Sequence, residues 1–344
     1  MRIRLWKICC MVGLIFVTTG CMGNVKSSAH EEITLSAWTA YWDMDQGMRE
    51  YRQIQGHMSK LSYFAAYFNA QDQLFVPAEV QTAKERAGKK NTGTAAYLTI
   101  VNDYKASAGK TTEKDLAVLR RVLADDEAVD RHVAEILALA RQGGYDGIEI
   151  DYEKVWKDKA LFQRYMDFIY RLSAAAIHDE LKLRVILEPS VPMDAPFCRG
   201  PEYVVMFYNL YGTHSGPGPK ADEAFILKTI KRMEKLPGKK AAAFSTGGCL
   251  WERSGPLGIV SGPTKRFIDE QTAMELQKKH SSELKRDGDS AALYFDYEEQ
   301  GKKYTVWYAD QETLNAWITI AAENGITDIS LWRLGGNQDI RDVR

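Results

Sequence analysis

The sequence predicts an α/β fold, a (β/α)8 TIM barrel with an α+β insertion between strands 7 and 8, and three observations predict it. Eight short β-type runs follow one another along the chain. Most of them are separated by stretches whose apolar residues recur at helical spacing. The interval before the last run is too long for a loop and contains strand patterns of its own. Strand and helix in eightfold alternation is typical of a barrel of parallel strands.

Residues 1–20 are expected to be an export signal and not part of the fold. Three basic residues precede an apolar run, 8–17, that is too short for a membrane span. The run ends in Thr-Thr-Gly-Cys, which resembles a lipoprotein cleavage motif, although Thr18 stands where that motif usually has Leu. We expect lipid on Cys21 and a tether over residues 21–32. An ordinary signal peptide cleaved nearby is the alternative.

The barrel is expected to occupy residues 33–344. Its eight strands are predicted at residues 33–38, 62–68, 96–101, 147–152, 183–188, 203–208, 240–245 and 326–332. Between them, residues 127–141 and 161–175 each carry an apolar stripe along one side, which indicates helices packed on the sheet.

About eighty residues separate the seventh and eighth runs, which is far more than a strand-to-helix loop needs. A helical pattern at 269–284 is followed by strand patterns at 291–297 and 303–307, which flank a Glu-Glu-Gln-Gly turn. We therefore expect an α+β insertion at about residues 252–310, on the face of the barrel whose loops carry function.

Composition excludes several classes of function. A formal net charge of −1 gives no electrostatic reason to expect a nucleic-acid partner. The chain has six His and no cluster with metal-ligand spacing, and it has no glycine-rich nucleotide loop, so we expect neither a metal nor a cofactor. After removal of the signal, Cys198 and Cys249 are the only internal pair, and nothing in the spacing shows that they meet.

The most informative segment is Asp-Gly-Ile-Glu-Ile-Asp-Tyr-Glu at residues 146–153. Side chains alternate along a strand, so Glu149, Asp151 and Glu153 share one face. Buried parallel strands are normally apolar throughout, and neighbouring buried carboxylates oppose one another's ionisation. An edge strand with a solvated acidic face would show the same alternation. The apolar opposite face and the helix that follows favour a functional site instead.

This segment resembles the DxxDxDxE signature of glycoside hydrolase family 18, the chitinase-like (β/α)8 enzymes. Asp146, Asp151 and Glu153 match the signature, and Glu149 stands where the family has Asp or Asn. Met-Phe-Tyr-Asn at 206–209 resembles the family's M-x-Y-D, with a neutral amide in place of its Asp.

Two further segments extend the resemblance over roughly residues 33–340. Residues 329–335 resemble the family's last strand, where a Trp, here Trp332, floors the sugar site. Residues 294–314 look like the inserted module of the bacterial branch that includes spore-cortex N-acetylglucosaminidases. No wall-binding LysM repeat is evident in the sequence.

The resemblance implies a retaining mechanism in which the 2-acetamido group of the substrate is the nucleophile. Glu153 would be the general acid, Asp151 would orient the acetamido N–H, and Tyr208 would donate to the acetamido carbonyl. The residues expected to contact substrate are Glu149, Asn209, Trp332, Tyr41 and Trp251. Tyr41 and Trp251 follow the first and seventh strands, where aromatic residues are equally expected from packing.

The sequence therefore predicts an exported, lipid-anchored monomer that hydrolyses β-1,4 bonds in polymers containing N-acetylglucosamine, with peptidoglycan favoured over chitin. Two alternatives stay open. One is a lectin-like barrel that binds glycans without turnover, against which the presence of Glu153 argues. The other is an envelope interaction protein with a vestigial site, which the departures at Glu149 and Asn209 keep open.

Overall fold

The computed structural model describes residues 32–88, 93–107, 110–253 and 265–344. The predicted signal at 1–20, Cys21 and all but the last residue of the tether lie outside the described residues. Within the described segments, no helix is long and apolar enough to cross a membrane.

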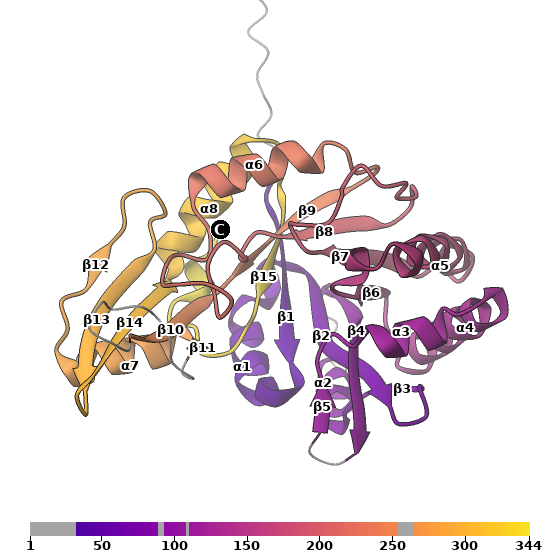
Figure 1. The fold of residues 1–344 in the computed structure, drawn as a ribbon, viewed down its shortest axis with the longest axis horizontal. Coiled ribbons are helices and arrows are strands. Elements are labelled where there is room, and N and C mark those ends of the chain that lie inside the picture. The colour runs from indigo at the N-terminus through magenta and orange to yellow at the C-terminus, as the bar shows by residue number, and fades with distance from the viewer. Residues whose placement is uncertain (1–31, 89–92, 108–109, 254–264) are drawn as a thin grey trace, which may run out of the picture. The chain divides into compact units, whose positions relative to one another are not determined.

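Eight parallel strands close into a barrel (Figure 1). Strand β1 (Thr34–Ala40) pairs with both β2 (Met58–Asn69) and β15 (Asp328–Trp332), and the pairing with β15 completes the ring. The remaining strands, in order around the barrel from β2, are β4 (Ala95–Ser107), β6 (Gly147–Asp151), β7 (Lys182–Leu187), β8 (Glu202–Met206) and β9 (Lys240–Ser245). Each of the eight predicted runs overlaps one of these strands, so the predicted barrel is confirmed.

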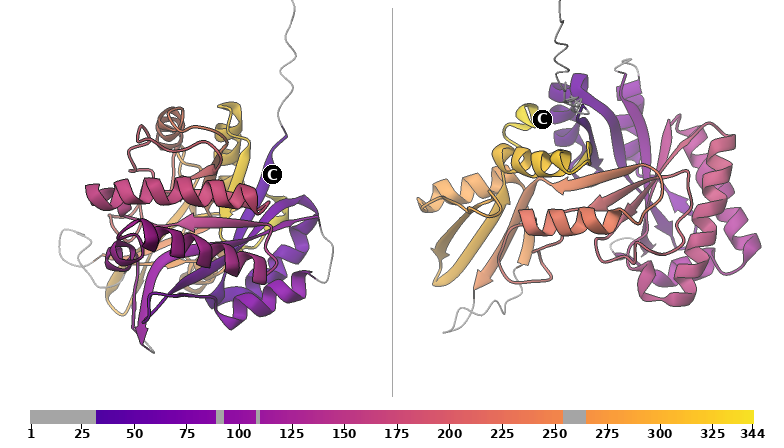
Figure 2. Two further views of the ribbon diagram at one scale, coloured as in Figure 1. Left: turned by 90° about the vertical axis from the view of Figure 1, so that its right-hand side faces the viewer. Right: turned by 90° about the horizontal axis from the view of Figure 1, so that it is seen from above.

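Helices cover the outside of the barrel (Figure 2). They are α1 (Met44–Ile54), α2 (Ala78–Gly88), α3 (Leu116–Val122), α4 (Asp126–Gln142), α5 (Lys159–His178), α6 (Glu223–Met233) and α8 (Gln311–Glu323). The helical patterns at 127–141 and 161–175 correspond to α4 and α5. Aspartates begin both helices, since Asp125 accepts a hydrogen bond from the Ala128 N–H and Asp158 accepts one from Leu161.

Short elements complete the barrel. Two strands, β3 (Leu74–Phe75) and β5 (Lys110–Thr112), form hairpins with β2 and β4. The 3-10 helices are η1 (Tyr41–Asp43), η2 (Gln55–His57), η3 (Val155–Lys157) and η4 (Ile340–Asp342).

The predicted insertion between the seventh and eighth barrel strands is present as a separate antiparallel sheet beside the barrel (Figure 1). Its strand order is β11 (Lys265–Ile268), β10 (Gly247–Arg253), β14 (Lys302–Ala309), β13 (Leu293–Glu299) and β12 (Lys285–Arg286). Helix α7 (Glu270–His280) packs against this sheet through Ala273 and Leu276.

The sheet of the insertion begins earlier in the chain than residue 252. Strand β10 begins at Gly247, and only Thr246 separates it from the barrel strand β9. Gly247 has a φ of +60°, and a Cβ atom on Gly248 would collide with the carbonyl of Trp307. Two consecutive glycines therefore let the chain change sheets within one residue.

The barrel interior has a polar layer below an apolar one. Near the N-terminal ends of the strands, Arg184 pairs with Glu202 at 3.2 Å, and Lys60 lies 3.4 Å from Glu202 and 3.5 Å from Asp328. Above this network, an apolar cluster includes Trp38, Ile186, Val204 and Met206, against which Tyr208 and Trp332 pack. The residues of the candidate active site, described below, lie above this apolar layer.

Candidate active site

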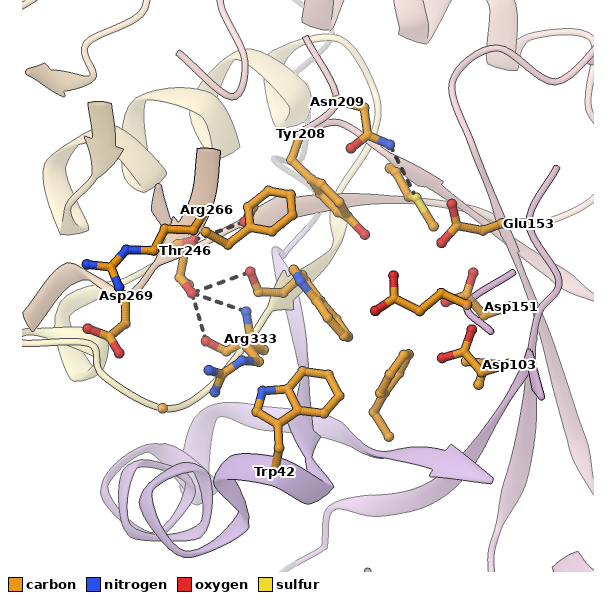
Figure 3. A pocket seen from close by; sticks show the side chains of 18 of the residues that line it. Trp42, Asp103, Asp151, Glu153, Tyr208, Asn209, Thr246, Arg266, Asp269 and Arg333 are labelled. Atoms are coloured by element: carbon orange, nitrogen blue, oxygen red, sulfur yellow. Dashed lines mark hydrogen bonds between the residues drawn. The ribbon is translucent and has the colours of Figure 1, made fainter. Parts of the chain in front are cut away.

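A cavity of about 830 Å³ opens at the C-terminal ends of the barrel strands (Figure 3). Its barrel side is formed by residues that end or follow β1, β4, β6, β8, β9 and β15. The insertion supplies another wall through Arg266, Phe267 and Asp269. In a barrel of this type the loops at this face carry the chemistry, so this cavity is the candidate active site.

Six of the eight predicted site residues line this cavity. They are Tyr41, Asp151, Glu153, Tyr208, Asn209 and Trp332. Strand alternation brings Asp151 and Glu153 to the same wall, where Figure 3 shows them beside Asp103.

Asp151 is buried, and burial together with the charge of Glu153 holds its pKa well above the ordinary value. Among the described residues, its Oδ1 atom has no hydrogen-bond partner. Leaving a buried carboxyl oxygen unpaired is unfavourable, and a donor on a ligand would relieve it. Asp151 is therefore suited to hold an N–H group of a bound molecule.

Glu153 follows β6 and is held at both its backbone and its side chain. Its N–H donates to Asn102 Oδ1 at 2.9 Å, and Asn102 Nδ2 donates to its carbonyl at 3.3 Å. Its carboxylate lies 2.5 Å from Lys114 Nζ. Burial raises the pKa of Glu153, and the Lys114 ammonium opposes that rise. A raised pKa suits a carboxyl group that must donate a proton near neutral pH.

Tyr208 extends from the end of β8 into the cavity (Figure 3). Burial and the neighbouring charges of Asp151 and Glu153 raise the pKa of its phenol well above 10. The hydroxyl therefore stays protonated and can donate a hydrogen bond to a ligand.

Aromatic rings form the floor of the cavity. Trp332 packs edge to face on Phe64 with 4.7 Å between ring centroids, and Tyr41 packs on Trp42 at 4.9 Å. Trp42 is 53% exposed and its ring centroid lies 6.4 Å from that of Trp332. Exposed rings in such a cavity suit stacking on the faces of sugar rings.

Glu149 is not a substrate contact, and the prediction that it is one is wrong. Its side chain is 0% exposed, inside the barrel and below the cavity. Side chains from four other barrel strands satisfy its carboxylate. Trp38, Ser62 and Thr99 donate to it at 2.6, 2.7 and 2.6 Å, and Arg184 pairs with it. The alternation of side chains along the strand predicts the face on which Glu149 lies. Because Glu149 comes two residues before Asp151, it lies one layer deeper in the barrel than Asp151.

Trp251 is also not a substrate contact. It lies within β10 of the insertion and is 1% exposed. Its indole N–H donates to the carbonyls of Gly212 and Ser215, both at 3.2 Å. The position that the sequence suggested for a loop is a strand, because β10 follows β9 directly.

Three residues of the site escaped the sequence analysis. Lys114 and Asn102 surround Glu153, and neither belongs to a recognisable motif. Arg333 follows Trp332 and pairs with Asp43 at 2.6 Å on the wall opposite the carboxylates (Figure 3). A basic residue directly after the last strand was a signal that could have identified Arg333.

Neither a metal cluster nor a disulfide is seen in the described part of the chain. There, no group of three or more His, Cys, Asp or Glu side chains is placed to hold a metal ion. Cys198 and Cys249 are both free thiols in the structure.

Comparison with known proteins finds relatives in the genus Bacillus. No model of a known protein family matches the chain. A putative sporulation-specific glycosylase of Bacillus subtilis is 24% identical over 66% of this chain and 55% of the relative. An uncharacterised B. subtilis glycosylase is 26% identical over 74% of both chains. A cortical fragment-lytic enzyme of Bacillus anthracis is 23% identical over 83% of this chain and 66% of the relative. The matches thus span between about half and three quarters of these relatives.

Solved structures share the fold. The Bacillus cereus spore cortex-lytic enzyme SleL superposes with a TM-score of 0.77 at 18% identity, over 90% of this chain and 73% of that one. A chitinase of Chromobacterium violaceum superposes with a TM-score of 0.75 at 18% identity, over 90% and 96%. In sequence, this chain is similar to glycosylases and cortical fragment-lytic enzymes of Bacillus. In fold, it shares the barrel of solved spore cortex-lytic and chitinase structures.

Proposed function

We propose that this protein hydrolyses β-1,4 glycosidic bonds in polymers that contain N-acetylglucosamine. The observation that carries the proposal is the convergence of Asp151, Glu153 and Tyr208 in one cavity at the strand ends. The relatives named as glycosylases and cortical fragment-lytic enzymes support it.

The chemistry needs only one protein acid, because an N-acetylated sugar supplies its own nucleophile. The acetamido oxygen attacks the anomeric carbon, the bond to the leaving oxygen breaks, and Glu153 gives its proton to that oxygen. Water then attacks the anomeric carbon of the oxazolinium intermediate and returns a proton to Glu153. Two displacements at one carbon retain its configuration.

Asp151 and Tyr208 would hold the acetamido group in position for this attack. The unpaired Oδ1 of Asp151 is available to accept from the acetamido N–H, and its carboxyl stabilises the positive charge that develops. The Tyr208 hydroxyl donates to the acetamido oxygen. Asn209 and Trp332, which also line the cavity, would bind the polar edge and the face of the same sugar.

A second function is favoured by one observation. The Lys114 ammonium pairs with Glu153, and a carboxylate held by a cation does not donate a proton readily. A barrel that binds glycans without turnover would show this pairing.

The two functions differ in the products that form. Release of reducing ends should be measured on peptidoglycan, chitin and a high-mannose glycopeptide, beside glycan binding to the same protein. The proposal expects release of reducing ends from peptidoglycan and from chitin. Binding to any of these glycans with no release from all three would favour the lectin-like alternative and contradict hydrolysis.

We further propose that the protein is exported as a monomer and anchored to the cell envelope by lipid on Cys21. The apolar run and the Thr-Thr-Gly-Cys motif support this proposal. Cys21→Ala should move the protein from the membrane fraction to the soluble fraction, because the acylated residue is gone. Membrane association that persists in this variant, with unchanged gel mobility, would argue against a lipid anchor.

A further inference from the structure

Lys114 is a cavity residue that the mechanism above does not use and that opposes it. It lies between β5 and α3, with its Nζ 2.5 Å from Glu153 Oε2. Its main-chain N–H donates to Asp103 Oδ1 at 2.8 Å, and its φ is +55°. The turn therefore fixes the backbone from which the ammonium reaches the acid.

This ion pair cannot persist when a substrate is bound for cleavage. The ammonium pairs with Oε2 of the Glu153 carboxylate, and a Glu153 that carries the proton for the glycosidic oxygen is no longer the anion of this pair. The Lys114 side chain is 37% exposed, so it has room to swing toward the cavity. Once Glu153 takes up a proton, the cation needs another anion, since a partly buried charge without a partner is unfavourable.

Two of the carboxylates around Lys114 already have partners, and a third is reserved for the substrate. Asp103 accepts from the N–H of Lys114 itself, and Glu188 accepts from the Lys154 N–H and from Trp156 Nε1. Asp151 is poised to receive the acetamido group, as argued above. A replacement anion supplied by the substrate would leave these contacts in place.

We propose that Lys114 selects substrates whose leaving-group sugar carries a carboxylate next to the scissile oxygen. This inference rests on the proposed hydrolase function and names its substrate class. In a muramic acid residue the lactyl ether at C3 is adjacent to O4, and in a uronic acid residue the C5 carboxylate lies on the other side of O4. Either carboxylate reaches the neighbourhood of the acid when O4 lies against Glu153.

Binding then becomes an exchange of partners. The substrate carboxylate pairs with the Lys114 ammonium, and Glu153 takes up a proton from solvent. That proton passes to O4 as the glycosidic bond breaks. A lactyl group that is still amidated by peptide is neutral and cannot make the exchange. The reaction that supplies a muramic substrate is therefore one that first hydrolyses this amide bond.

The test compares matched oligosaccharides on the wild-type protein. The free-acid tetrasaccharide of alternating N-acetylglucosamine and N-acetylmuramic acid is set against the same compound with its lactyl carboxylates amidated. We expect kcat/KM to be at least about tenfold higher for the free acid, since a hydrogen bond between charged groups is worth this factor or more. A hyaluronan oligosaccharide, with glucuronic acid as the leaving sugar, distinguishes the lactyl source from the uronic source.

Variants assign the discrimination to Lys114. Lys114→Met should bring the free-acid and amidated substrates to within a few-fold of each other, and Lys114→Arg should keep part of the difference. A purely structural role for Lys114 would lower kcat/KM on both substrates together.

The pH profile supplies an independent readout. With neutral chitotetraose, the alkaline limb of kcat/KM should move up by about one pH unit or more in Lys114→Met, because Glu153 loses an opposing charge. The charged and titratable groups that face this pair are Asp103, Glu113, Asp151, Glu188, Lys154 and Tyr208.

The outcomes separate the inference from the function on which it rests. Equal kcat/KM for the free-acid and amidated substrates overturns the inference and leaves hydrolysis in place, as does discrimination that survives in Lys114→Met. The wild-type comparison tests the preference for the free acid even if Lys114→Met fails to fold, and the conservative Lys114→Arg variant then tests the assignment to Lys114. No product from any oligosaccharide contradicts the proposed function itself, and the inference falls with it.

Discussion

Glu153→Gln is expected to lower kcat by a factor of about 10² to 10⁴ while the protein still binds glycan. The carboxamide keeps the shape of the side chain but has no proton to give to the leaving oxygen. Turnover and affinity should be measured on the same N-acetylated oligosaccharide. The pH profile of the wild type adds a check: kcat/KM should fall as pH rises through the raised pKa of Glu153, because the acid is then ionised.

Glu127→Gln is the matched control for this variant. Glu127 lies on α4, where its exposed carboxylate pairs with Arg131, and it is not part of the cavity. Turnover in this control should stay close to wild type. If Glu153→Gln also keeps kcat within a few-fold of wild type, Glu153 is not the general acid.

Glu149→Gln is expected to destabilise the fold by about 3 to 5 kcal/mol, the range for removing one partner of a buried ion pair. The change removes one of the two carboxylates that pair with Arg184 in the barrel interior, so that only Glu202 remains. The midpoint of guanidinium unfolding measures the loss. The same Glu127→Gln control, in which an exposed pair is broken, should cost less than about 1 kcal/mol.

Two companion variants define what Glu149 does. In the double variant Glu149→Gln/Arg184→Met, the loss should be smaller than the sum of the two single losses, because both charges are gone. Glu149→Asp should also destabilise, since a shorter side chain cannot reach donors on four strands at once. If Glu149→Asp is as stable as wild type and more active, the site has drifted from its ancestral form and the buried network is not an adaptation.

The sequence was sufficient to predict the residues that depend on local periodicity. The alternation along 146–153 put Asp151 and Glu153 on one face, and both line the cavity. The eight β-type runs predicted the strands, because each buried strand has a compact apolar pattern bounded by a helix or a turn. The Tyr208 and Trp332 positions followed from the resemblance, which marks the ends of two other strands.

The depth at which a side chain lies in the barrel, and its partners on other strands, could not be predicted in the same way. Periodicity gives the face of Glu149, but its burial depends on Arg184, which comes from the adjacent strand and lies directly opposite it in the register. Lys114 reaches Glu153 only because a turn with positive φ directs the chain, and no spacing in the sequence shows this. Trp251 was misplaced because the two glycines before it start a strand that looked like a loop.

The central claim is that the acetamido group of the substrate is the nucleophile, and the anomeric form of the first product tests it most directly. ¹H NMR during the first minutes of cleavage should show the β-anomer when the substrate is an N-acetylated oligosaccharide. The fully de-N-acetylated oligomer of the same length should not be cleaved, because the nucleophile is missing. An α-anomeric first product, or efficient cleavage of the de-acetylated oligomer, would contradict the account.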